Sequence, residues 1–146
     1  MTDRPAGARS IDEILAAARA RLERVTVEQA FAEARDGDAV IVDIRPAWQR
    51  AAEGEVPGAL VIERNHLEWR FDPEGGSRVP EASYDARVLV ICSEGYTSSL
   101  AAAALHDLGV RRATDVEGGF IAWIAAGLPV SRTVSDPVPV PRRTPA

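Results

Sequence analysis

Three short apolar runs constrain the fold most strongly. Residues 39–42, 59–62 and 88–91 contain only alanine, leucine, isoleucine and valine, with no alternating polar positions. A strand that is apolar on both faces is typical of a parallel sheet covered by helices on both sides. Residues 113–116 are a weaker fourth candidate. We therefore expect a parallel sheet of about four strands in an α/β fold.

Helical patterns separate these runs, as a layered α/β fold requires. They cover roughly residues 46–53, 98–108 and 119–126. The segment 63–86 is rich in proline and glycine, and we expect most of it to be an excursion outside the core.

Two capping-box patterns predict helix starts near the N-terminus. Ser10 is followed three residues later by Glu13, and Thr26 by Gln29. In such a pair each side chain bonds to the backbone of the other residue, which satisfies free N–H groups of the first turn. We expect helices over about 11–23 and from Thr26 to about residue 35.

The chain divides into three parts. Residues 1–21 form an N-terminal extension with one helix, and residues 22–130 form a single domain. Residues 131–146 contain four prolines, which favour an extended, solvated segment. We therefore expect a proline-rich disordered tail there.

Charge and composition exclude several classes of function. The net charge of -5 gives no basic surface for nucleic acid or for anionic membranes. No apolar run approaches the ~20 residues of a membrane span. A single cysteine cannot form an internal disulfide, which fits a reducing cytoplasm. One cysteine and two histidines show no metal-ligand spacing, so we expect no metal and no cofactor.

The single cysteine, Cys92, directly follows the apolar run 88–91 and precedes an alanine-rich helix. Backbone N–H groups and the helix dipole favour an anion at such a junction, and the thiolate is the reactive form of cysteine. One alternative is a buried, inert cysteine. The polar loop that follows favours a reactive site, and Gly95 permits a close backbone approach. Its residues are Ser93, Glu94, Gly95, Tyr96, Thr97 and Ser98.

Asp43 and Arg45 follow the first apolar run. Since parallel strands end at the same edge of a sheet, these residues could lie near Cys92. The favoured interpretation is a structural ion pair, and a direct role toward substrate is the alternative. His66 is expected to be exposed to solvent rather than to donate a proton.

Four motifs in order resemble the rhodanese-like sulfurtransferase domain, over roughly residues 22–130. Each motif alone is weak, but the four together are specific. They are Asp43-Ile44-Arg45, Glu55-Val56-Pro57-Gly58-Ala59, the loop from Cys92 to Ser98, and Gly118-Gly119 with Trp123 and Gly127-Leu128-Pro129.

This resemblance implies a three-layer α/β domain whose central parallel sheet is flanked by helices. It also implies that Cys92 accepts a sulfane sulfur, becomes a persulfide and passes the outer sulfur to a thiol or to cyanide. Loop amides 93–98 would hold the anionic sulfur, and the hydroxyls of Thr97 and Ser98 could add hydrogen bonds. The implied enzyme is of the thiosulfate:cyanide sulfurtransferase type.

The sequence departs from the family pattern at positions that bear on the donor. Glu55 replaces a histidine that is mainly structural. Glu94 stands where thiosulfate-specialised members carry a cation, and it would repel a dianion. Gln49 stands where those members use an arginine, although Arg50 is adjacent. Arg64 could supply positive charge instead, and a persulfide or polysulfide suits this loop better than thiosulfate.

Three other functions remain open. A related phosphatase would need an arginine at the sixth position after Cys92, where this chain has Ser98. A non-catalytic module would bind a partner or carry sulfur, with the N-terminal helix or the tail contacting a protein. A redox sensor would need an external thiol, because the chain has no second cysteine. The sequence names neither the natural donor nor the acceptor.

Overall fold

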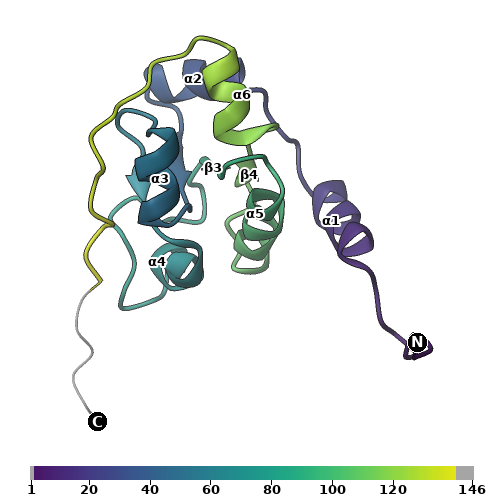
Figure 1. The fold of residues 1–146 in the computed structure, drawn as a ribbon. Coiled ribbons are helices and arrows are strands. Elements are labelled where there is room, and N and C mark those ends of the chain that lie inside the picture. The colour runs from purple at the N-terminus through teal and green to yellow at the C-terminus, as the bar shows by residue number, and fades with distance from the viewer. Residues whose placement is uncertain (1, 141–146) are drawn as a thin grey trace.

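The computed structural model describes residues 2–140 (Figure 1). Its centre is a four-stranded, all-parallel sheet in the order β2-β1-β3-β4. The α/β class with a central parallel sheet is therefore confirmed. The strands are β1 (Val40–Asp43), β2 (Leu60–Val61), β3 (Val88–Ile91) and β4 (Thr114–Asp115), as the three apolar runs and the weaker fourth candidate predicted.

Both faces of the sheet are covered. Along β1 and β3, which pair from Val40 with Val88 to Asp43 with Ile91, successive side chains enter different cores. Val42 belongs to one core and Ile41 to the other. This alternation on a fully apolar strand explains why the sequence shows no polar positions there.

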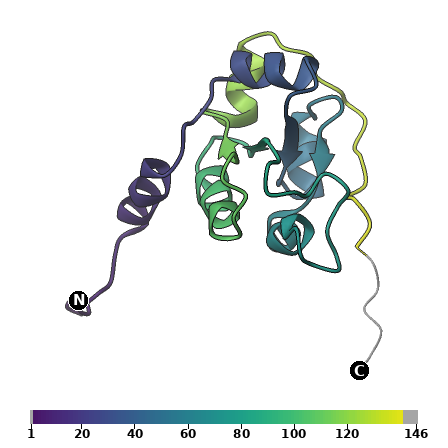
Figure 2. The ribbon, with the colours of Figure 1, turned by 180° about the vertical axis from the view of Figure 1, so that it is seen from behind.

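The described part of the chain has six α-helices and a short 3-10 helix. Helices α2 to α6 flank the sheet, and α1 lies outside them against α5 (Figures 1 and 2). Helices α4 and α5 contribute to the core that contains Val42, whereas α2 and α6 contribute to the core that contains Ile41. None of the described helices has the length and apolar character needed to cross a membrane. The helices are α1 (Ile11–Ala20), α2 (Val27–Arg35), α3 (Ala47–Glu53), η1 (Arg64–His66), α4 (Leu67–Phe71), α5 (Thr97–Asp107) and α6 (Gly119–Ala125).

Segment 63–86 departs from the expectation of an excursion outside the core. Its first part forms η1 and α4, and Leu67 and Phe71 are fully buried, with Val79 1% exposed. The glycines and prolines that suggested an excursion all follow Asp72. Leu67 and Phe71 are four residues apart, so one face of a single helical turn can bury both. The expectation is therefore wrong for this part of the segment.

The N-terminal extension packs on the domain. Both predicted capping boxes form, at Ser10 for α1 and at Thr26 for α2. Helix α1 lies against α5, and Arg21 forms an ion pair with Asp107 of α5 at 2.7 Å. After α1, Val25 adds one parallel bridge to the free edge of β4, through Val116.

Residues 131–140 are extended, as the prolines predict, but they are not free of the domain. Ser131 and Glu55 exchange two backbone hydrogen bonds of 2.8 Å. Further along, the Val138 N–H donates to the Val61 carbonyl of the edge strand β2 at 2.9 Å. The residues between the prolines keep N–H groups that an open strand edge can accept. The expectation of a disordered tail is thus wrong for 131–140, and residues 141–146 lie outside the described residues.

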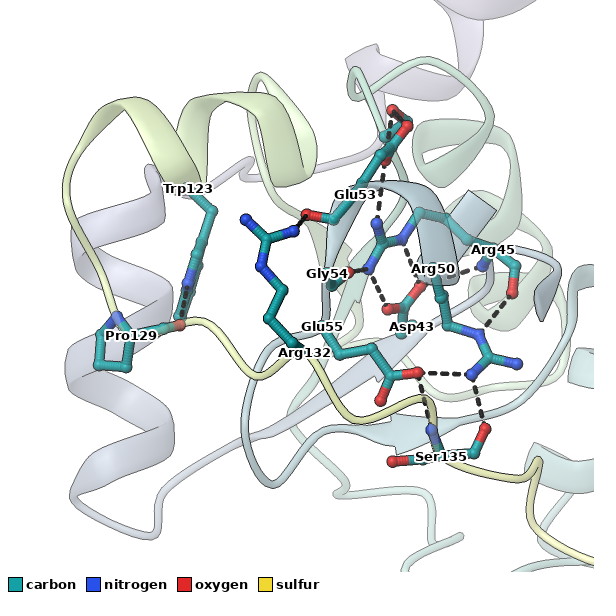
Figure 3. A network of polar contacts seen from close by, with 11 residues as sticks. Asp43, Arg45, Arg50, Glu53, Gly54, Glu55, Trp123, Pro129, Arg132 and Ser135 are labelled. Atoms are coloured by element: carbon teal, nitrogen blue, oxygen red, sulfur yellow. Dashed lines mark hydrogen bonds and ion pairs between the residues drawn. The ribbon is translucent and has the colours of Figure 1, made fainter. Parts of the chain in front are cut away.

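A buried ion pair fastens this segment (Figure 3). Arg50 is fully buried, and its Nη1 donates to Glu55 Oε2 and to the Ser135 carbonyl, both at 2.6 Å. The Ser135 N–H donates to the same carboxylate oxygen at 3.0 Å. Burial by itself would raise the pKa of Glu55, but the hydrogen bonds from Arg50 and Ser135 outweigh it and hold that pKa below its usual value.

We predict that Glu55→Gln destabilises the protein by about 2–4 kcal/mol at pH 7, because the Arg50 charge is left buried without a partner. Since the folded-state pKa of Glu55 lies below the usual 4.5, its charge stabilises the fold above that pH. This contribution to stability disappears as the pH falls through the lowered folded-state pKa of Glu55. Urea unfolding of both proteins should therefore show a difference that narrows below about pH 4.

Glu68→Gln is the matched control, because the Arg64–Glu68 pair is partly exposed and should contribute less than about 1 kcal/mol. Equal losses in the two variants, or a difference that persists unchanged at acid pH, would contradict this account of the Arg50–Glu55 pair.

Candidate active site

Cys92 is the first residue after β3, at the carboxyl edge of the parallel sheet. Its side chain is 5% exposed, and its Sγ accepts a hydrogen bond from the Gly95 N–H at 3.3 Å. Gly95 has a φ of +85°, which side chains of L-residues rarely adopt. Helix α5 begins two residues later, at Thr97. The loop therefore folds back so that a backbone donor meets the sulfur beside a helix N-terminus.

The paired glycines before α6 pack directly on this loop. The first N–H groups of α6 donate hydrogen bonds to carbonyls of this loop. Phe120 donates to the Cys92 carbonyl at 2.8 Å and Ile121 to the Ser93 carbonyl at 3.0 Å. A Cβ on Gly119 would lie 2.6 Å from both carbonyl oxygens. The fourth motif is thus a close backbone contact with the cysteine loop.

The other loop residues divide into two groups. Glu94, Tyr96 and Thr97 are exposed to solvent. Two hydroxyls are directed elsewhere: Ser93 Oγ donates to both carboxylate oxygens of Glu53 at 2.9 Å, and Ser98 Oγ donates to Asp115 at 2.8 Å. In this arrangement the Ser98 hydroxyl makes its hydrogen bond to Asp115 and not to Cys92.

Asp43 and Arg45 pair with each other (Figure 3). Arg45 donates to the two Asp43 oxygens at 3.0 and 2.6 Å, and both side chains are 1% exposed. The Arg45 guanidinium also lies 4.3 Å from the centre of the Phe120 ring. Burial alone would lower the pKa of Arg45, but Asp43 and Glu53 outweigh it and raise that pKa. Neither charge is free to face a substrate in this arrangement.

Glu53 connects this pair to the cysteine loop. It accepts from Arg45 Nη1 at 2.9 Å and from the Ser93 hydroxyl at the same distance. Arg45 also donates to the Gly54 carbonyl at 2.9 Å. The end of β1, the end of α3 and the residue after Cys92 are therefore held together by one chain of charged hydrogen bonds.

The arginines suggested for donor binding occupy different environments. Arg64 is partly exposed on η1, after β2, and pairs with Glu68 at 2.7 Å. Arg50 is fully buried and bound to Glu55. His66 is exposed. Neither arginine contacts a residue of the Cys92 loop within the described hydrogen bonds and ion pairs of residues 2–140.

Sequence analysis missed three residues that contact this loop. Arg19 and Arg24, both upstream of the first strand, donate to the Gly95 carbonyl at 2.7 and 3.0 Å. Asp115 is fully buried at the end of β4, where it accepts from Arg24, Ser98 and Ser99. Asp115 had a signal in the sequence, since an acid at the end of a strand also marked Asp43. The two arginines had none, because only the tertiary fold brings them to Gly95.

The segment that forms this site matches a known protein family. The family model described as rhodanese-like domain matches residues 26–126. The chain belongs to the rhodanese-like domain family. Its resemblance to that family is thereby confirmed, and the fold with its central sheet is the family's fold.

Solved structures extend the comparison. A protein of unknown function from Rhodopseudomonas palustris, described as a possible tyrosine phosphatase, is 33% identical with a TM-score of 0.79, over 90% of this chain and 99% of that chain. A human single-domain sulfurtransferase is 23% identical with a TM-score of 0.58, over 70% and 95% of the two chains. The polysulfide-sulfur transferase homodimer from Wolinella succinogenes is 23% identical with a TM-score of 0.65, over 80% and 83%. The last two show a shared fold.

The match to the R. palustris protein also covers flanking residues. Residues 26–126 make up about two thirds of this chain, whereas that match covers 90% of it. Part of the segments outside the family match therefore belongs to the fold that the two proteins share.

We predict that Gly119→Ala costs about 3–5 kcal/mol, because it combines a left-handed backbone with a methyl group forced against two carbonyl oxygens. Gly127→Ala is the matched control: its φ of +72° is similar to the +61° of Gly119, but nothing lies within 4 Å of its Cβ position. This variant should lose only about 1–2 kcal/mol of stability, the cost of a left-handed backbone at a residue with a Cβ. Urea unfolding of both variants measures the difference, and equal costs would show that the α6 contact with the Cys92 loop is not tight.

Proposed function

We propose that this protein is a sulfurtransferase in which Cys92 carries the transferred sulfur. The observation that carries the proposal is the position of the thiol: Sγ lies at the end of β3, accepts the Gly95 N–H at 3.3 Å and precedes the 11-residue helix α5. Backbone N–H groups and a helix N-terminus stabilise a negative charge on sulfur. Membership in the rhodanese-like family, with sulfurtransferases among the structural neighbours, supports the same chemistry.

The reaction consists of two displacements. In the first, the Cys92 thiolate attacks the outer sulfur of a donor R–S–S⁻, the donor S–S bond breaks and R–S⁻ leaves with a proton taken from solvent. In the second, a thiolate or cyanide attacks the outer sulfur of the Cys92 persulfide, and the Cys92 thiolate leaves. No net oxidant is needed, and the covalent intermediate divides one transfer into two easier steps.

The charges around the loop favour an organic persulfide donor over thiosulfate. The loop 93–98 contains no cation, and its one charged residue, Glu94, is exposed. Arg50 is buried against Glu55, and Arg64 is paired with Glu68. A dianionic donor would thus approach the exposed Glu94, while Arg19, a cation that contacts the loop, donates to the Gly95 carbonyl and to Ser99.

The phosphatase suggested for the R. palustris protein is a poorer match to this chain. The position where a phosphate-binding arginine would stand is Ser98, which is fully buried and donates its hydroxyl to Asp115. A reducing compartment such as the cytoplasm suits the proposed chemistry, because it keeps a single thiol free.

Intact-protein mass spectrometry tests the proposal directly. The protein is exposed to glutathione persulfide, polysulfide or thiosulfate in parallel, and then to cyanide. We expect a gain of one sulfur atom that cyanide removes as thiocyanate, and no gain in Cys92→Ser. Absence of loading from every donor would contradict a transferase and favour the non-catalytic alternative, in which the fold binds a partner without turnover.

We predict that Glu94→Lys increases the loading rate with thiosulfate roughly fivefold or more, because removing a repulsion of about 1 kcal/mol changes a rate by that factor. Loading by a persulfide with no net charge, such as cysteamine persulfide, should change little. Asp38→Lys is the control, since Asp38 is exposed just before β1, at the opposite edge of the sheet from Cys92. An equal increase in both variants would indicate a general effect of net charge rather than a local effect of Glu94.

A further inference from the structure

Two arginines from outside the family match hold the backbone of the Cys92 loop. Arg19, in the last turn of α1, donates through Nη2 to the Gly95 carbonyl at 2.7 Å and through Nε to Ser99 Oγ at 3.0 Å. Its guanidinium also lies 5.6 Å from the centre of the Tyr96 ring. Arg24 donates to the same carbonyl at 3.0 Å. Gly95 is the residue whose N–H meets the Cys92 sulfur.

The two arginines differ in their charge partners. Arg24 makes a two-pronged ion pair with Asp115, at 2.9 and 3.1 Å, so its charge is largely compensated. Arg19 has no carboxylate within 4.0 Å among residues 2–140. Its hydrogen bonds go to neutral oxygens of the loop and of α5. Arg19 therefore brings a net positive charge to the loop, while Arg24 mainly fixes its position.

We propose that Arg19 is a positioning residue for Cys92: it holds Gly95 in the conformation that presents its N–H to the sulfur, and its charge favours the thiolate. The use of this contact in catalysis rests on the proposed function. The effect of Arg19 on the Cys92 thiol does not require that the protein transfers sulfur. The two guanidinium groups hold the peptide plane between Gly95 and Tyr96. This limits the φ and ψ that Gly95 can adopt, and with them the direction of its N–H. A nearby cation lowers the pKa of a thiol.

Other charges around the loop oppose or cancel one another. The pairs Asp43–Arg45 and Arg24–Asp115 are internally neutral, and Glu53 accepts from Arg45. Helix α6 carries no charged residue, and η1 and α4 contribute the Arg64–Glu68 pair. Glu94 and Glu117 are exposed to solvent, which screens their charges. Arg132, which also has no carboxylate partner among residues 2–140, donates to the Glu53 carbonyl and not to the loop. Arg19 thus contacts the loop itself with an unpaired positive charge.

The experiment measures the Cys92 thiol itself. Rates of alkylation by iodoacetamide between pH 5 and 10 give the pKa of the single thiol, whether or not any sulfur donor reacts. We expect the pH profile of Arg19→Gln to move to higher pH, with alkylation at pH 7 about three- to tenfold slower, because the thiolate loses a nearby positive charge. Arg19→Lys keeps the charge and should recover most of the shift. KM and kcat for a persulfide donor are measured on the same variants.

Arg21→Gln is the matched control. Arg21 also lies at the C-terminal end of α1, but it pairs with the exposed Asp107 and makes no hydrogen bond to the loop among the described residues. Thermal unfolding reports whether each variant folds, and Arg19→Lys provides a second, charge-retaining variant should Arg19→Gln be unstable. A thiol pKa in Arg19→Gln equal to that of the wild type would overturn the proposal, as would an equal shift in Arg21→Gln. A shifted pKa in a protein that no donor loads would instead refute the proposed transferase and leave the role of Arg19 intact.

Discussion

The buried ion pair between Asp43 and Arg45 is the interaction on which the site depends. Removing two charges from water costs several kcal/mol, so such a pair contributes less to stability than to geometry. Here Arg45 uses its remaining donors on Glu53 and the Gly54 carbonyl, and Glu53 in turn accepts from Ser93. The end of β1 therefore sets the position of the residue next to Cys92. This explains how an acid and a base two residues apart can matter to the site without touching a substrate.

Backbone contact supplies the second constraint, because the cysteine loop and the start of α6 approach too closely for side chains. Gly119 lies against the carbonyls of Cys92 and Ser93, and a Cβ on Gly95 would lie 2.8 Å from the Gly118 nitrogen. Helix α6 bonds the carbonyls of Cys92 and Ser93, and two arginines bond the carbonyl of Gly95, whose N–H donates to Sγ. A backbone N–H directed at the sulfur stabilises a negative charge there.

Local patterns predicted most of the fold, since strand burial and helix capping are properties of neighbouring residues. The four strands, both capping boxes and the position of Cys92 at the end of β3 follow from such patterns. What failed depended on distant partners. Nothing near Val138 indicates that its N–H meets Val61, and nothing near Arg19 indicates that it reaches Gly95. Helix α4 was missed for another reason, because the glycines and prolines after Asp72 obscured a single apolar turn.

The flanking segments complete the sheet as well as the site. A four-stranded sheet has two open edges, and an open edge is a template for association with another chain. Val25 bridges to the outer edge of β4, and Val138 donates one backbone hydrogen bond to β2, so each edge is contacted by a residue outside the family match. The same N-terminal segment carries Arg19 and Arg24 to the loop. Edge protection and loop positioning are therefore coupled through one stretch of chain, and a domain cut to residues 26–126 would lose both together.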